Sequence, residues 1–198
     1  MAAVDARLID RRDRGRLTIV SEPGSDSTAG RLLVAAVMLI DPNFFRTVVY
    51  VVDHDEEGAF GLVLNRPSTE LVSEHLPELA GDVGEPTVVF VGGPVQPEAA
   101  TGYRRAEVHD PDRIDPGVVP LDFEDDTTGV ESRVFAGYAG WGAGQLEDEL
   151  EEGAWHVVDA ELGDLFSRDP ENLWSDVLRR QGGHLAMLAT YPPDPSLN

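Results

Sequence analysis

Two arginines are the first candidates for chemistry, because cations are scarce in this chain. The 198 residues contain 37 carboxylates and 15 basic residues, all of them arginine, for a formal net charge of −22. Arg46 and Arg66 flank the two strands of an expected hairpin. A guanidinium can hold a carboxylate or phosphate through two parallel hydrogen bonds. The favoured alternative is a structural salt bridge to one of the many acids.

The glycine-rich segment around Trp141 has the surroundings of a dinucleotide-binding loop but not its spacing. An expected strand precedes it, an acidic helix follows it, and Asp159 ends the next strand. Glu147 stands where the third glycine of G-x-G-x-x-G belongs. Acids in the helix would also repel a phosphate. We therefore favour a tight turn whose glycines let Trp141 pack against the core.

The polar run from Asp53 to Glu57 could in principle ligate a divalent ion, because it combines carboxylates with an imidazole. Successive side chains of a strand face opposite sides, so Asp53 and Asp55 could converge while His54 points away. Polar residues at a hairpin tip are usually only solvated. We expect no metal and no cofactor, with Asp53 and Asp55 as the weak alternative.

Composition excludes several classes of function. The chain has no cysteine and no lysine, which removes thiolate nucleophiles, disulfides, thiolate metal sites, Schiff bases and the phosphate-loop lysine. It has no G-x-S-x-G motif. The strong negative charge opposes direct contact with nucleic acid. These exclusions favour a protein without catalytic activity.

The organisation along the chain indicates one domain. Residues 1–29 are polar and predict a mobile tail, residues 30–190 form the domain, and residues 191–198 are a Pro-rich end. The longest apolar run, 32–40, is too short to span a bilayer, and no secretory signal precedes it. We expect a cytoplasmic protein that does not contact the membrane.

Hairpin strands come first and helices come late, which favours an α+β fold. A hairpin is predicted for 47–55 and 59–65, around a glycine turn. The clearest helix starts at Pro170, with Asp169 as its cap and Gly182 as its stop. Other strands are predicted at 30–40, 87–93, 132–140 and 154–160, and other helices at 71–79 and 145–152.

Three long blocks, Asp41–Pro67, Phe90–Glu98 and Gly137–Trp155, resemble the signature blocks of the bacterial AlgH/YqgE family, and LWSDVLRRQGG continues the match. The resemblance covers roughly 30–183. It implies an α+β fold whose bifurcated, mostly antiparallel sheet closes partly into a barrel flanked by helices. It implies no activity: members are sometimes described as transcriptional regulators, and the family offers no agreed catalytic residues.

Within these blocks some residues are polar, aromatic or conformationally special beyond what packing demands. They are the candidate ligand-binding residues Asn43, Arg46, Asn65, Arg66, Gly92, Gly93, Trp141 and Gln145. The leading hypothesis is a non-catalytic regulatory or protein-interaction module with an unknown protein partner. The alternative is a small-molecule-binding protein or enzyme with a site near Arg46, Arg66 and Trp141. A transcriptional regulator is the third, with direct DNA binding disfavoured by charge.

Overall fold

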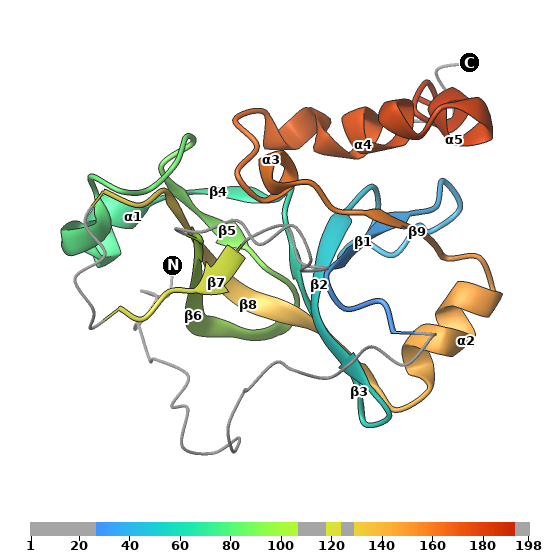
Figure 1. Ribbon diagram of the computed structural model, residues 1–198, viewed down its shortest axis with the longest axis horizontal. Coiled ribbons are helices and arrows are strands. Elements are labelled where there is room, and N and C mark those ends of the chain that lie inside the picture. Colours follow the sequence, from blue (N-terminus) through green and yellow to red (C-terminus); the bar gives the residue numbers. More distant parts are fainter. Residues whose placement is uncertain (1–26, 107–117, 124–128, 193–198) are drawn as a thin grey trace.

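A nine-stranded mixed sheet forms the centre of the molecule, and helices lie along its margins (Figure 1). The computed structural model describes residues 27–106, 118–123 and 129–192. The strands are β1 (Arg31–Ala35), β2 (Val48–Asp55), β3 (Gly58–Val63), β4 (Pro67–Leu71), β5 (Val88–Val91), β6 (Val95–Arg105), β7 (Val118–Pro120), β8 (Ser132–Gly142) and β9 (Trp155–Asp159). The main path through the sheet is β4-β5-β8-β3-β2-β1-β9, and β6 and β7 lie off this path.

Strand β8 is the point at which the sheet divides. Its C-terminal part pairs with β3, with Ala139 opposite Gly61. Farther back along β8, Phe135 pairs with Phe90 of β5 in parallel and with Thr101 of β6 in antiparallel orientation. This bifurcated, mostly antiparallel sheet confirms the predicted α+β class. The partial closure into a barrel is not observed, because the main path ends at β4 and β9 and these two strands do not pair.

The apolar run 30–40, predicted as one strand, is a strand only as far as Ala35. The chain then turns, with the Ala36 amide bonded to the Ala154 carbonyl, and the side chains of Met38 and Ile40 are 84% and 80% exposed. The prediction was too long because apolar composition continues after the pairing partner ends. The sequence also gave no indication of β6, which contains proline and several polar residues.

The predicted hairpin is formed by β2 and β3, with Asp55 opposite Gly58. Gly58 has a φ of 136°, and a Cβ there would lie 2.2 Å from the Trp141 carbonyl oxygen, so the turn and the close approach of β8 both require glycine. The hairpin is thereby held against β8 at its tip. Its other end leads into Asn65 and Arg66.

The helices are short. They are α1 (Val72–His75), α2 (Gln145–Glu151), α3 (Leu162–Leu165), α4 (Leu173–Gln181) and α5 (Gly183–Leu188). The predicted helix at Pro170 begins instead with a 3-10 turn, Pro170–Asn172, and Asp169 makes no side-chain cap bond to the backbone. Gly182, with a φ of 70°, ends α4 as expected. Among the described residues, no helix has both the length and the apolar character needed to cross a membrane.

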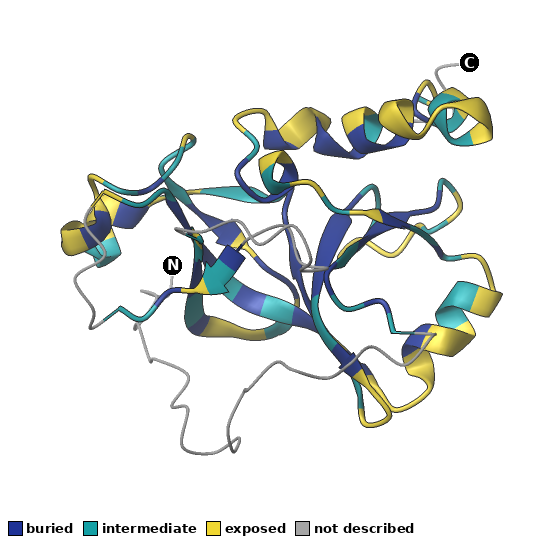
Figure 2. Cartoon of the chain, viewed as in Figure 1, coloured by how far each residue is buried: buried dark blue, intermediate teal, exposed yellow. Residues whose placement is uncertain are grey.

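The sheet separates two main apolar clusters. Because side chains alternate along a strand, Leu32 and Val34 of β1 pack in the cluster that contains Trp174 of α4. Leu33 and Ala35 belong to the cluster on the other face. Strand β1 is therefore buried on both faces, as predicted from its sequence. Figure 2 shows α4 with its buried residues toward the sheet and its exposed residues outward.

Candidate functional site

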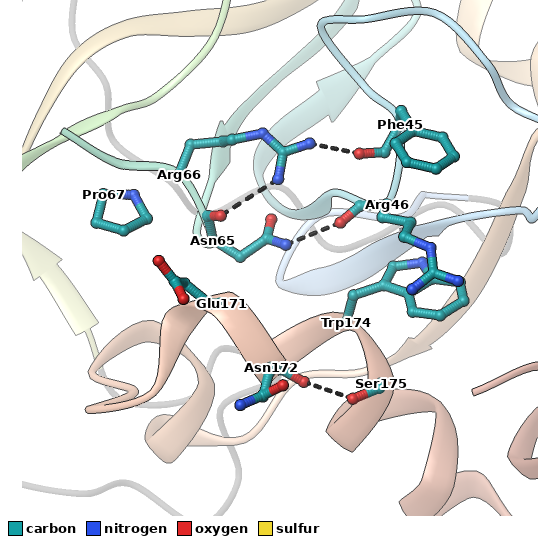
Figure 3. A pocket seen from close by; sticks show the side chains of 9 residues that line it. All are labelled: Phe45, Arg46, Asn65, Arg66, Pro67, Glu171, Asn172, Trp174 and Ser175. Atoms are coloured by element: carbon teal, nitrogen blue, oxygen red, sulfur yellow. Dashed lines mark hydrogen bonds between the residues drawn. The ribbon is translucent and has the colours of Figure 1, made fainter. Parts of the chain in front are cut away.

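An open groove of about 460 Å³ lies where the loop before β2 and the turn between β3 and β4 meet the start of α4 (Figure 3). Small-molecule sites typically have volumes of roughly 300–1,000 Å³, so this groove can hold a small ligand. We call it the arginine groove. It is lined by Phe45, Arg46, Asn65, Arg66, Pro67, Glu171, Asn172, Trp174 and Ser175.

Arg46 is held at the groove in an unusual backbone conformation. Its φ is 54°, a left-handed value that is uncommon for a residue with a side chain. Its guanidinium carbon lies 4.4 Å from the ring centroid of Trp174, and one guanidinium nitrogen donates to the Tyr191 carbonyl. Residues in such conformations persist only where neighbours fix them, and they cluster at functional sites.

Asn65 is the neighbour that fixes the Arg46 backbone. Its side-chain amide donates to the Arg46 carbonyl at 2.8 Å, and its side-chain oxygen accepts from the Val48 amide at 2.9 Å. Asn65 itself is only 4% exposed. It therefore acts as a buried brace that joins the end of β3 to the loop before β2, and it positions Arg46 rather than facing a ligand.

Arg66 also lines the groove, and its hydrogen bonds within the described residues go to backbone oxygens. One terminal nitrogen donates to the Phe45 carbonyl and the other to the carbonyl of Asn65 at 3.4 Å. Desolvation by burial lowers the pKa of Arg66 and of Arg46 below the ordinary arginine value. A bound anion would offset that penalty, since it stabilises the charged form.

The predicted salt bridge is not found for either residue among the described parts of the chain. Arg31, Arg105, Arg179 and Arg180 each form an ion pair with a carboxylate. Arg46 and Arg66 form none with a described residue, although the chain has more than twice as many acids as bases. The side chain of Glu171, which is exposed on the facing wall, also makes no hydrogen bond or ion pair with any described residue. The groove thus presents charged groups of both signs that are left unneutralised.

The other sequence candidates lie outside the lining of the arginine groove. Asn43 is exposed in the loop before β2, where its backbone N–H donates to the Asp41 carboxylate at 2.8 Å. Gly92 and Gly93 lie against the backbone of β8: an added Cβ would come within 2.3 Å of the Gly137 oxygen and 2.1 Å of the Tyr138 carbonyl carbon. Close backbone packing accounts for both glycines without a ligand.

Trp141 and Gln145 belong to a second arrangement, which we call the tryptophan cluster and which consists of Trp141, Gln145, Glu149 and Trp155. One oxygen of Glu149 accepts from both indole nitrogens, at 2.9 and 2.8 Å, and the other accepts from the Gln145 amide at 3.0 Å. Phe44 packs edge-on against Trp155. The polar groups of this cluster are satisfied by one another and by the Gly142 backbone N–H, which donates to the Gln145 side-chain oxygen at 3.1 Å.

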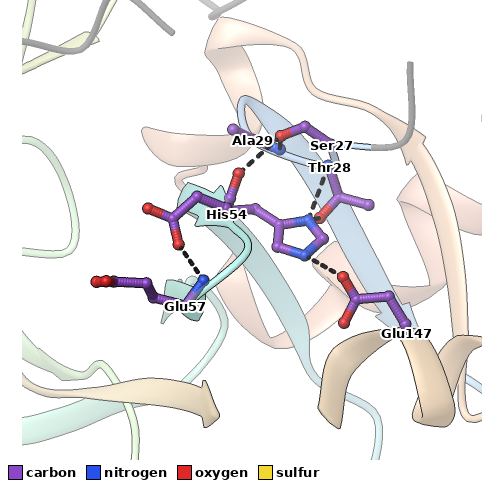
Figure 4. A network of polar contacts seen from close by, with 7 residues as sticks. Ser27, Thr28, Ala29, His54, Glu57 and Glu147 are labelled. Atoms are coloured by element: carbon purple, nitrogen blue, oxygen red, sulfur yellow. Dashed lines mark hydrogen bonds and ion pairs between the residues drawn. The ribbon is translucent and has the colours of Figure 1, made fainter. Parts of the chain in front are cut away.

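Sequence reasoning missed a network around His54, in which His54 and Thr28 are buried and Glu147 is exposed (Figure 4). Its Nδ1 accepts from the Thr28 amide at 3.1 Å, so the ring proton resides on Nε2, which donates to Glu147 at 2.9 Å. The Thr28 hydroxyl lies 3.0 Å from Nδ1. The residue types match a nucleophile–base–acid triad, but the Thr28 amide already occupies Nδ1 and Thr28 is 6% exposed. The network ties the chain before β1 to β2 and α2.

No local pattern could have revealed this network, since its members come from three distant parts of the sequence. The neighbouring carboxylates do not form a metal site with it. Among the residues that the structure describes, no three His, Asp or Glu side chains are grouped as a metal ion would need, and this includes Asp53 and Asp55.

Comparison with known proteins identifies relatives over most of the chain. A family model described as AlgH-like matches residues 32–186, a range that contains every residue lining the arginine groove. A UPF0301 protein of Streptomyces coelicolor is 51% identical, with 87% of this chain and 96% of that protein covered. One of Thermobifida fusca is 44% identical, with the same coverage of 87% and 96%.

Solved structures show the same fold. The crystal structure of protein DIP2367 from Corynebacterium diphtheriae is similar with a TM-score of 0.73 and 30% identity, covering 86% of this chain and 93% of that one. The solution structure of the AlgH protein from Pseudomonas aeruginosa is similar with a TM-score of 0.63 and 33% identity, covering 86% and 97%. None of these names states a substrate or a ligand.

Proposed function

This chain belongs to the AlgH-like family, and we propose that it is a non-catalytic binding protein whose arginine groove holds a small ligand through a carboxylate or phosphate group. One observation carries the proposal. In a chain of net charge −22, two arginines share a groove and neither has a carboxylate partner among the described residues. The regulatory role expected from the sequence would then depend on occupancy of the groove.

The electrostatics of the groove support an anion. A partly buried cation without a counterion is costly, because it has lost water and gained only weak dipoles in return. Arg46 and Arg66 donate to carbonyl oxygens, which orient the guanidinium groups without neutralising them. The groove also lies beside the first turn of α4, where the helix dipole favours negative charge. An anionic group would gain from Arg46, from Arg66 and from the helix dipole.

The lining residues support binding rather than acid–base chemistry. General acid–base catalysis needs a side chain placed to take or give a proton, and the groove has no histidine in its lining. Its one carboxylate, Glu171, is exposed and contacts no hydroxyl or amine of the described residues. The hydroxyl of Ser175 donates to the Asn172 carbonyl at 3.0 Å, so no base in the lining activates it. Arginine stays protonated at neutral pH. The groove is therefore suited to holding charge, not to transferring protons.

Two cations in one groove are also too few for a DNA-binding surface. Proteins that bind DNA through its backbone neutralise several phosphates with Lys or Arg, and the rest of this chain is strongly acidic. We therefore do not propose direct DNA contact. A regulatory effect on transcription would have to pass through a ligand or another protein.

The test begins with native mass spectrometry of the purified full-length protein, to detect a retained small molecule. Titrations with inorganic phosphate and with succinate, followed by amide chemical shifts, then locate and measure binding. We expect shifts at the loop before β2 and at the start of α4. Arg66→Gln should weaken binding at least about tenfold, the equivalent of ~1.4 kcal/mol.

Arg179→Gln is the matched control, since it removes the same charge from the exposed face of α4, where Arg179 pairs with Asp176. It should leave binding unchanged. If neither probe shifts the groove residues and no adduct is retained, the protein does not use this groove for anions. Equal binding by wild type and Arg66→Gln would contradict the proposal just as clearly.

A further inference from the structure

The arginine groove is not uniformly positive, and its second wall carries the opposite charge. Glu171 stands on the 3-10 turn Pro170–Asn172 and lines the same cavity as Arg46 and Arg66. Figure 3 shows its carboxylate pointing into the space beneath Arg66 and Pro67. It has no hydrogen-bond or ion-pair partner within the described parts of the chain.

The two charged walls do not neutralise each other. Among the described residues, neither Arg46 nor Arg66 forms an ion pair with Glu171, although all three face one cavity. Arg66 instead donates to carbonyl oxygens of its own wall, at Phe45 and Asn65. Arg46 crosses to the helical side, where it stacks on Trp174 and donates to the Tyr191 carbonyl rather than to Glu171. Because opposite charges in one groove attract, a separation of this kind is favourable when a ligand spans the gap and contacts both.

We infer that the ligand of the arginine groove is a small amino acid-like zwitterion, whose acidic group binds Arg46 and Arg66 and whose ammonium group binds Glu171. This inference rests on the proposed anion-binding function and adds a specificity to it. A ligand with only negative charge would face repulsion from Glu171, and one with only positive charge would face both arginines. Discrimination of this sort uses repulsion as well as attraction.

The remaining lining residues fit a short, polar-ended ligand. Phe45 and Pro67 provide apolar surface for its carbon chain, and the amide of Asn172 can hydrogen-bond at the Glu171 end. The indole of Trp174 is only 3% exposed and is covered by Arg46. The indole is therefore not free to stack on a nucleobase, which disfavours a nucleotide.

The experiment compares two matched series of probes on the full-length protein. One series is glycine, β-alanine, 4-aminobutyrate and 6-aminohexanoate, and the other is acetate, propionate, butyrate and hexanoate. The probes of a pair share a carbon chain and differ in the ammonium group. Affinities come from amide chemical shifts of the groove residues. For at least one chain length we expect the amino acid to bind fivefold or more tightly than its partner.

Variants assign that advantage to Glu171. In Glu171→Gln the amino acid should lose its advantage, while the plain carboxylate should bind as well as before or better. Glu151→Gln, an exposed acid on α2 outside the groove, should change neither series. The Glu171 side chain has no partner in the described structure, so its replacement should leave the fold intact, which circular dichroism checks.

The outcomes separate this inference from the function on which it rests. If every amino acid binds only as well as its matched carboxylate, or if Glu171→Gln keeps the advantage, the zwitterion is excluded and the anion groove stands. If neither series shifts the groove in wild type, both proposals are overturned. If Arg66→Gln abolishes binding of both series while Glu171→Gln affects one, both proposals are supported.

Discussion

The arginine groove and the tryptophan cluster both combine aromatic rings with charged side chains, yet they differ in how their polar groups are satisfied. In the tryptophan cluster one carboxylate, that of Glu149, accepts from two indoles and one amide. Among the described residues of the arginine groove, the guanidinium groups donate hydrogen bonds to carbonyl oxygens and to no carboxylate, and the Glu171 side chain has no hydrogen-bond or ion-pair partner. The polar groups of the tryptophan cluster are satisfied within the chain, whereas the arginine groove keeps charges that no described residue pairs.

This difference teaches which charged residues to regard as structural. A buried polar group that finds all its partners inside the chain stabilises the fold, and removing one partner leaves the others unsatisfied. A charge that the fold holds in place but does not neutralise contributes little to folding and much to binding. On this criterion, substitution of Glu149 should lower stability and leave ligand binding unchanged. Substitution of Arg66 should weaken binding and change stability little.

The largest expected effect is on stability, from Glu149→Ala. The change leaves two indole N–H groups without their acceptor, and each such loss costs about 1–3 kcal/mol. We expect the free energy of unfolding in urea to fall by about 3 kcal/mol, with anion binding in the arginine groove unaffected. Glu151→Gln is the control on the same helix. If Glu149→Ala lowers the free energy of unfolding no more than the control does, the tryptophan cluster does not stabilise the fold.

The next effect should appear in both properties, from Asn65→Ala. Asn65 is a satisfied, buried side chain, but it supports the groove through the Arg46 carbonyl. Removing it should lower the free energy of unfolding by about 2 kcal/mol and also weaken phosphate binding, because the Arg46 backbone loses its brace. Urea titration and chemical-shift titration on the same sample measure the two effects. Unchanged binding despite lower stability would mean that Arg46 holds its position without Asn65.

The sequence offered Arg46, Asn65 and Arg66 as candidates, the arginines because cations are scarce in an acidic chain and Asn65 because packing does not demand a polar residue there. All three line the arginine groove. The alternative hypothesis also placed Trp141 near these residues, and Trp141 lies outside the lining of the groove. Ala59 at the start of β3 pairs with Trp141, whereas Asn65 and Arg66 follow the other end of that strand. Trp141 and the pair Asn65–Arg66 are therefore at opposite ends of one strand. The loop before β2 links the two regions, because Phe44 stacks on Trp141 with ring centroids 6.2 Å apart and Phe45 and Arg46 line the groove.

Glu171 was not among the sequence candidates for a physical reason. It stands in the first turn before a helix, where an acid has a role of its own because it complements the helix dipole. Only the packing of α4 against the sheet brings it opposite Arg66. The network of His54 with Thr28 and Glu147 escaped for the same reason, since contacts between distant segments depend on the register of the sheet and leave no local pattern.

The smallest expected effect is a pH dependence of stability. It comes from a third kind of polar group, one that is buried but has no hydrogen-bond partner. The Nε2 atom of His156 on β9 is buried with no hydrogen-bond partner among the described residues. Desolvation by burial, and then the charge of His184, lowers the pKa of His156 from its ordinary value of 6.5. As the pH falls, this imidazole is therefore protonated at a higher pH in the unfolded chain than in the folded chain.

Stability should consequently decrease as the pH falls through 6.5, and the decrease from this residue should level off once the folded imidazole is protonated as well. Urea midpoints at half-unit steps from pH 7.5 to 5.0 measure the change. His184→Gln removes the repelling charge but not the burial, so it should make the decrease shallower without abolishing it. A profile identical to wild type would show that burial alone sets the pKa of His156, and that α5 does not influence β9 electrostatically.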